Sequence, residues 1–126
     1  MRRAIVLTSV LVFLVCSSGC GDSHESLAKD GLSTTKEMVT VLEGVKDEAS
    51  AKAAKPKLKS LAEQLNDYNA RQAKLPAMTE AELKTLESKY GKEMEETQKK
   101  LMGQLMRIQF DPKLFAELND IDLKMK

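Results

Sequence analysis

The stretch Thr79–Ile108, TEAELKTLESKYGKEMEETQKKLMGQLMRI, decides the fold because one helical periodicity runs through all of it. Mostly apolar side chains recur along it at intervals of three and four residues, which is the repeat of an amphipathic helix. They are Leu83, Leu86, Tyr90, Met94, Thr97, Leu101, Leu105 and Ile108. Thr79 and Glu82 have the spacing of a capping box, which marks a helix start. The sequence therefore predicts one helix from residue 80 to about 108, roughly 43 Å long.

Two similar patterns precede this stretch. The first covers about residues 26–46 and consists of Leu27, Gly31, Thr34, Met38, Val41 and Val45, widened by Leu32, Val39 and Leu42. The second covers about residues 51–74 and consists of Ala51, Ala54, Leu58, Leu61, Leu65, Tyr68, Gln72 and Leu75. Gly44 and Asp47 favour a turn between them, and Ser50 is a candidate cap for the second helix. Because Pro56 lies inside the second pattern, we expect a kink there or a helix that begins there.

A short fourth helix is predicted after the long one. Asp111 and Pro112 are favoured residues for a helix cap and a first turn, and Leu114, Leu118 and Ile121 would face the core. No stretch of the sequence alternates with a period of two over the length of a strand. Because short connections favour antiparallel neighbours, we expect an all-α fold. It would be a coiled-coil-like, antiparallel three-helix bundle with a short C-terminal fourth helix.

The first 19 residues have the order of a cleaved signal peptide. Arg2 and Arg3 form a basic start, and the apolar run 4–15 follows. That run is shorter than the roughly 20 residues that a membrane-spanning helix needs, so an uncleaved anchor is the weaker interpretation.

The residues that follow resemble the lipobox of bacterial lipoproteins. Ser17, Ser18 and Gly19 precede Cys20 directly, with Ser17 at a position where the family prefers Leu. The resemblance implies cleavage between Gly19 and Cys20 and lipidation of Cys20. The alternative is cleavage nearby by ordinary signal peptidase, because Ser17 and Gly19 also fit a small-x-small site.

Cleavage before Cys20 would divide the chain into a signal peptide (1–19), a lipidated cysteine with a polar tether (20–25) and a helical domain (26–126). Loss of Arg2 and Arg3 reduces 20 basic residues to 18 against 19 acidic ones, so the mature domain is nearly neutral. Gly21 lacks the Asp that, in enterobacterial lipoproteins, accompanies retention in the inner membrane. The resemblance therefore favours the periplasmic face of the outer membrane.

Composition and residue inventory exclude several classes of function. A net charge of +1 is too small for a dedicated nucleic-acid-binding protein, and 31% charged residues do not fit a protein with several membrane spans. The only histidine, His24, lies in the expected tether, and Cys20 would be acylated. The common hydrolase triads cannot be assembled from these residues, so we expect no enzyme and no cofactor.

Three clusters have both a functional and a structural interpretation. The functional interpretations are a cation site at Glu93, Glu95 and Glu96, a copper site at Met94, Met102 and Met106, and a surface for anionic headgroups at Lys52, Lys55, Lys57 and Lys59. The structural interpretations are favoured: helical ion pairs for the glutamates, gap filling between helices by the methionines, and an exposed basic face for the lysines.

The terminal Lys126 resembles the C-terminal lysine through which the murein lipoprotein of enteric bacteria is joined to peptidoglycan. Pro56, Pro76 and Pro112 break the uninterrupted heptad of that family, so we do not expect a peptidoglycan link. We expect a membrane-anchored envelope lipoprotein that acts as a structural or protein-interaction module, bound to the membrane through its lipid and to a protein partner or to itself. The alternative is a periplasmic carrier of a ligand or of copper, using the helical core or the methionines.

Overall fold

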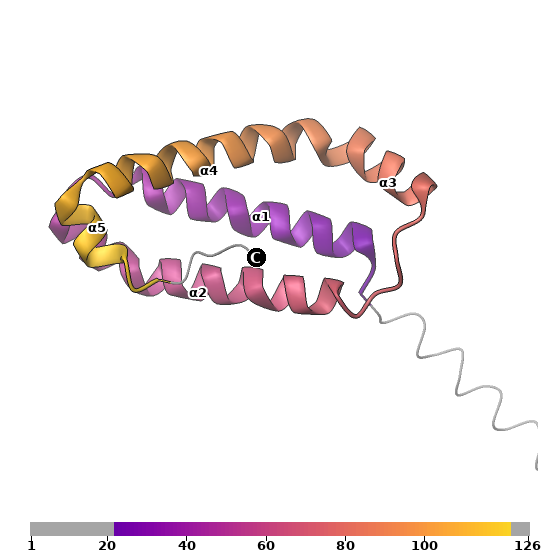
Figure 1. Cartoon of the computed structure of the whole chain (residues 1–126), viewed down its shortest axis with the longest axis horizontal. Helices are drawn as coiled ribbons and strands as arrows, with labels where there is room; N and C mark the ends of the chain where they lie inside the picture. The colour runs from indigo at the N-terminus through magenta and orange to yellow at the C-terminus, as the bar shows by residue number, and fades with distance from the viewer. Residues whose placement is uncertain (1–21, 122–126) are drawn as a thin grey trace, which may run out of the picture.

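The computed structural model describes residues 22–121, and all regular secondary structure in that range is helical (Figure 1). The elements are α1 (His24–Glu43), α2 (Glu48–Gln72), α3 (Glu80–Leu86), the π-helical segment η1 (Glu87–Gly91), α4 (Lys92–Phe110) and α5 (Pro112–Leu118). The predicted all-α class is confirmed. The predictions for residues 1–19, Cys20 and Lys126 lie outside the described residues.

A capping box that the sequence analysis missed starts α1. Ser23 Oγ accepts a hydrogen bond from the backbone N–H of Ser26 (3.1 Å), and Ser26 Oγ accepts one from the N–H of Ser23 (3.0 Å). The usual signature has Glu or Gln at the third helical position, where this chain has Ser. The helix therefore begins two residues earlier than predicted, and His24 and Glu25, which were expected to belong to the tether, are helical.

The start of α2 also differs from the prediction. Asp47, not Ser50, is the cap: its Oδ1 accepts from the N–H of Ser50 (2.7 Å), while Ser50 Oγ accepts from the N–H of Asp47 (3.0 Å). The helix then continues through Pro56, so the expectation that it begins at Pro56 is wrong. Proline removes one donor and leaves the carbonyl of Lys52 without its helical partner. Both residues are exposed, so water can bind that carbonyl.

The predicted long helix is present from Glu80 to Phe110, as α3, η1 and α4 in direct succession. Its predicted capping box is confirmed, because Thr79 Oγ1 accepts from the N–H of Glu82 (3.2 Å) and Glu82 Oε2 accepts from the N–H of Thr79 (2.8 Å). The π-helical segment η1 was not predicted. In such a segment the hydrogen bonds reach one residue further along the chain than in an α-helix.

The helices pack as a bundle in which α1 lies between α2 and α4 (Figure 1). α2 runs antiparallel to α1, and the α3–η1–α4 rod then returns parallel to α1. α5 turns back and packs against both α2 and α4. We call this end, where α5 lies, the closed end. The opposite end, where α1 begins, α2 ends and α3 lies, is the open end.

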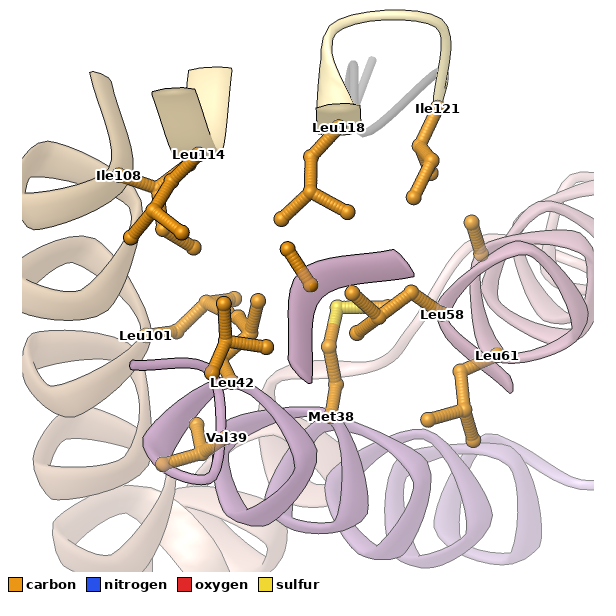
Figure 2. Close-up of a cluster of buried hydrophobic side chains, with 13 residues drawn as sticks. Met38, Val39, Leu42, Leu58, Leu61, Leu101, Ile108, Leu114, Leu118 and Ile121 are labelled. Carbon is orange, nitrogen blue, oxygen red and sulfur yellow. The ribbon is translucent and has the colours of Figure 1, made fainter. Parts of the chain in front are cut away.

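The main core lies at the closed end (Figure 2). The largest side chains with less than 2% exposure are those of Met38, Leu42, Val45, Leu58, Leu61 and Leu101. From the C-terminal segment, Leu114, Leu118 and Ile121 point into the same cluster, as predicted. α5 therefore completes a core that α1, α2 and α4 alone would leave uncovered on one side.

Burial along the long helix stops short of the open end. Thr97, Leu101 and Ile108 are buried, whereas Met94 is 44% exposed and Leu83 is 51% exposed. These two positions belong to the predicted buried face, but no counterpart of α5 covers them. The repeat in the sequence predicts which face of a helix is apolar. It does not predict whether another element covers that face along its whole length.

Replacing Leu58 by Ala tests the position of the core. Leu58 is fully buried, so the change should lower the free energy of unfolding by about 2–5 kcal/mol. Leu83→Ala is the matched control, and it should change that free energy by about 0.5 kcal/mol or less because Leu83 is half exposed. Urea denaturation followed by far-ultraviolet circular dichroism measures both. Equal effects of the two substitutions would contradict this core.

Candidate functional site

An apolar groove runs between α1, α2 and α4 toward the open end. One pocket of about 270 Å³ and a second of about 410 Å³ share four lining residues, so they adjoin each other, and we call the pair the groove. The shared residues are Ala28, Gln72, Met94 and Gln98. The first pocket is enclosed chiefly by Leu27, Gly31, Leu32, Leu65, Tyr68 and Leu101. The second extends the groove past Met78, Leu83 and Leu86.

Small residues on α1 create this hollow. Ala28, Gly31 and Thr35 line the first pocket and follow one another at intervals of three and four residues, so they lie on one face of the helix. A Cβ atom added at Gly31 would meet no heavy atom within 4 Å, so the backbone there borders open space. Longer apolar side chains from α2 and α4 form the walls. The result is a narrow groove with an apolar lining, the usual character of a ligand site.

Charged residues line only the second pocket of the groove. The first pocket is lined by no charged residue, and the second includes Glu87 and Glu95 together with the imidazole of His24. Lys99 lies 2.5 Å from Glu95 and, through this hydrogen bond, holds the pKa of that carboxyl below its ordinary value. Neither pocket has lysine or arginine among its lining residues. The groove therefore favours an uncharged apolar ligand over an anionic one.

The first described residue is held against the wall of this groove. The carboxylate of Asp22 accepts a hydrogen bond from Arg71 Nε (2.8 Å) and forms an ion pair with the same guanidinium. Arg71 also lies over the ring of Tyr68, 5.6 Å from its centroid, and Tyr68 lines the groove. The hydrogen bond from Arg71 lowers the pKa of Asp22, and the same bond raises the pKa of Arg71.

Two further contacts hold the first turn of α1. His24 Nε2 donates to the carbonyl of Pro76 (2.8 Å), and Glu25 accepts from Lys89 Nζ (2.8 Å). The hydrogen bond from Lys89 lowers the pKa of Glu25. The other ring nitrogen of His24 is buried without a hydrogen-bond partner. The start of α1 is thus bound to the α2–α3 connection and to η1. These contacts fix the position of α1 relative to the other elements that line the groove. The sequence analysis missed these ties because each joins residues about 50 or more positions apart.

The acidic cluster is divided between two ion pairs. Glu93 pairs with Lys36 of α1, and Glu95 pairs with Lys99. Within residues 22–121, no group of three or more His, Cys, Asp or Glu side chains is placed to hold a metal ion.

The methionines do not occupy the positions that were predicted for them. Met94 lines the groove, whereas Met102 and Met106 line neither of its pockets. Met102 and Met106 are 50% and 52% exposed, so the prediction that they fill gaps between helices is wrong. They lie on the outer face of α4, four residues apart, with Phe110 one further turn along and 77% exposed.

The lysine run of α2 is largely paired with acidic residues of other elements. Lys55 and Lys59 both contact Asp120, at 2.9 Å and 3.3 Å, and Lys57 contacts Glu37 of α1 at 2.6 Å. These pairs explain an otherwise acid-free basic stretch, because its counterions come from α1 and from the segment after α5. They reduce the positive charge that this face can offer to anionic headgroups.

Comparisons with protein-family models, curated proteins and solved structures find no match to this chain. None of the helices in the described part of the chain is long and apolar enough to cross a membrane.

Replacing Arg71 by Gln tests how the N-terminal end is held. Without the guanidinium, the pKa of Asp22 should rise toward its ordinary value of 3.8, measured by NMR titration of the carboxyl carbon. Because the folded-state pKa is depressed, the stability contributed by this contact is present above the ordinary pKa. It is lost as the pH falls through the folded value. Lys84→Gln, which removes the partner of Glu80, should leave the titration of Asp22 unchanged. An unchanged Asp22 in Arg71→Gln would exclude the contact in solution.

Proposed function

We propose that the chain is a lipoprotein of the bacterial envelope, anchored through lipid on Cys20, whose helical domain acts as a structural or protein-interaction module. The observation that carries this proposal is the order of a basic start, an apolar run and Ser17-Ser18-Gly19 directly before Cys20. In this proposal residues 1–19 are removed and the outer membrane is the favoured location. Multiple acyl chains would hold the protein stably, since one chain binds a bilayer only marginally.

The arrangement of the domain fits an anchor at its N-terminus. Asp22, two residues after Cys20, is bound to Arg71 near the end of α2, so the bundle would sit close to the bilayer with its open end toward it. The outer face of α4 carries exposed Met102, Met106 and Phe110. In this proposal these exposed apolar residues form the contact surface for a protein partner or for a second copy.

A carrier of an apolar ligand is the second candidate function. The groove between α1, α2 and α4 favours it, since an apolar groove of this kind is what such a carrier needs. The copper version of this candidate gains no support from the methionines, because Met94 lines the groove and Met102 and Met106 do not.

Mass spectrometry of the protein isolated from its native envelope tests the anchor. We expect an N-terminal peptide that begins at Cys20 and carries the mass of two or three acyl chains, together with an unmodified Lys126. Cys20→Ser should remove the lipid and release the protein from the membrane fraction. An unmodified N-terminus near Cys20 would contradict the proposal and leave a freely diffusing helical binding protein. A muropeptide on Lys126 would contradict the expectation that no wall link exists.

A further inference from the structure

We propose that one acyl chain attached to Cys20 lies in the apolar groove of the same molecule. This inference rests on the proposed lipidation of Cys20. It gives the groove one occupant, a single hydrocarbon chain, and one source, the protein's own anchor.

The first support is the place where the described chain begins. Two residues span at most about 7 Å, so the covalent chain limits the reach between Cys20 and Asp22 to that distance. Asp22 is bound to Arg71, and Arg71 stacks on Tyr68 in the wall of the groove. Gln72, the next residue after Arg71, lines both pockets. An acyl chain on Cys20 would therefore begin within reach of the groove.

The second support is the shape of the groove. Its floor is formed by Ala28 and Gly31, where small residues leave open space along one face of α1. Its walls are apolar side chains such as Leu65, Met94 and Leu101. The second pocket, about 410 Å³, is in the size range of small-molecule sites, roughly 300–1,000 Å³, and the adjoining first pocket, about 270 Å³, is slightly smaller. A long, narrow and apolar hollow fits an extended hydrocarbon chain better than a compact ligand.

The third support is charge. A free fatty acid or an anionic lipid would bring a negative group to the outer part of the groove, where Glu87 and Glu95 lie and where no lysine or arginine is among the lining residues. Burying an anion there without a cation is unfavourable. The ester and amide links of a lipidated cysteine carry no charge. The electrostatics thus favour the anchor's own chain over an anionic lipid from the membrane.

This placement has a consequence for anchoring. A chain held in the groove is withdrawn from the bilayer, so fewer chains hold the protein to the membrane. Because one chain binds only marginally and two bind stably, occupation of the groove would change how firmly the module is held. The groove would in this way regulate the anchor that the proposed function requires.

Photo-crosslinking of the full chain tests the proposal. Cells are grown with a fatty acid that carries a diazirine at its methyl end, the membranes are irradiated, and the purified protein is mapped by tryptic mass spectrometry. In the wild-type protein we expect crosslinks within one molecule to the peptides 30–36 of α1 and 60–71 of α2, which line the groove. Gly31→Leu fills the groove and should reduce these crosslinks about tenfold.

Gly103→Leu is the matched control. A Cβ atom at Gly103 also meets no heavy atom within 4 Å, but this residue lines neither pocket of the groove. Both substitutions replace glycine inside a helix and raise helix propensity equally, so circular dichroism should show both variants folded. Gly103→Leu should leave the crosslinks at the wild-type level.

Four other outcomes would contradict the inference, and each has a different interpretation. An unmodified Cys20 in the mass spectrum means that the proposed function itself has failed. A lipidated Cys20 whose crosslinks all fall on bilayer lipids leaves the anchor in place and excludes the groove as its site. Crosslinks confined to covalent dimers would assign the groove to a second copy's lipid. Crosslinking of the same peptides in Cys20→Ser by labelled free lipid would make the protein a lipid carrier.

Discussion

The packing of α5 across the gap between α2 and α4 is the contact on which the rest of the bundle depends. α1 packs against both α2 and α4, but these three helices alone leave an apolar side open. Leu114, Leu118 and Ile121 cover that side at the closed end, and each is 6% exposed or less. Burial of apolar side chains is the dominant favourable contribution to folding. The closed end therefore carries most of the stability, and the open end is positioned by it.

The open end is held by a different kind of interaction. Beside the buried side chain of Leu27, it has three polar contacts: Asp22 with Arg71, Glu25 with Lys89 and His24 with the carbonyl of Pro76. Two of these contacts are ion pairs, and ion pairs exposed to solvent contribute little to stability. Their main effect is to fix the orientation of the start of α1, because each contact joins it to a different element. The main apolar cluster at the closed end and these polar contacts at the open end together hold the helices in place around the groove.

The sequence predicted the helices and the faces that they bury, because both depend on local spacing. The cap at Thr79 and the inward positions of Leu114 and Leu118 follow from residues a few positions apart. The sequence did not predict which parts of those faces would be covered. Met94 and Leu83 belong to the same repeat as Leu101, yet only Leu101 lies where α5 completes the packing. The groove is the uncovered remainder, and the contacts beside it join residues far apart in the chain, which no local pattern reveals.

The groove and the closed end use the same α1 face with different residues. Toward the closed end this face carries Met38 and Leu42, whose side chains fill the space between the helices. Toward the open end it carries Ala28 and Gly31, which leave that space empty while the walls remain apolar. A glycine in a helix lowers its stability by roughly 1 kcal/mol relative to alanine. The chain therefore gives up stability at Gly31 and leaves the hollow unfilled in the half of α1 that is nearer to its start. Small residues at these positions lower the stability of a bundle that has only a structural role. In a bundle that binds an apolar chain, they provide the space for that chain.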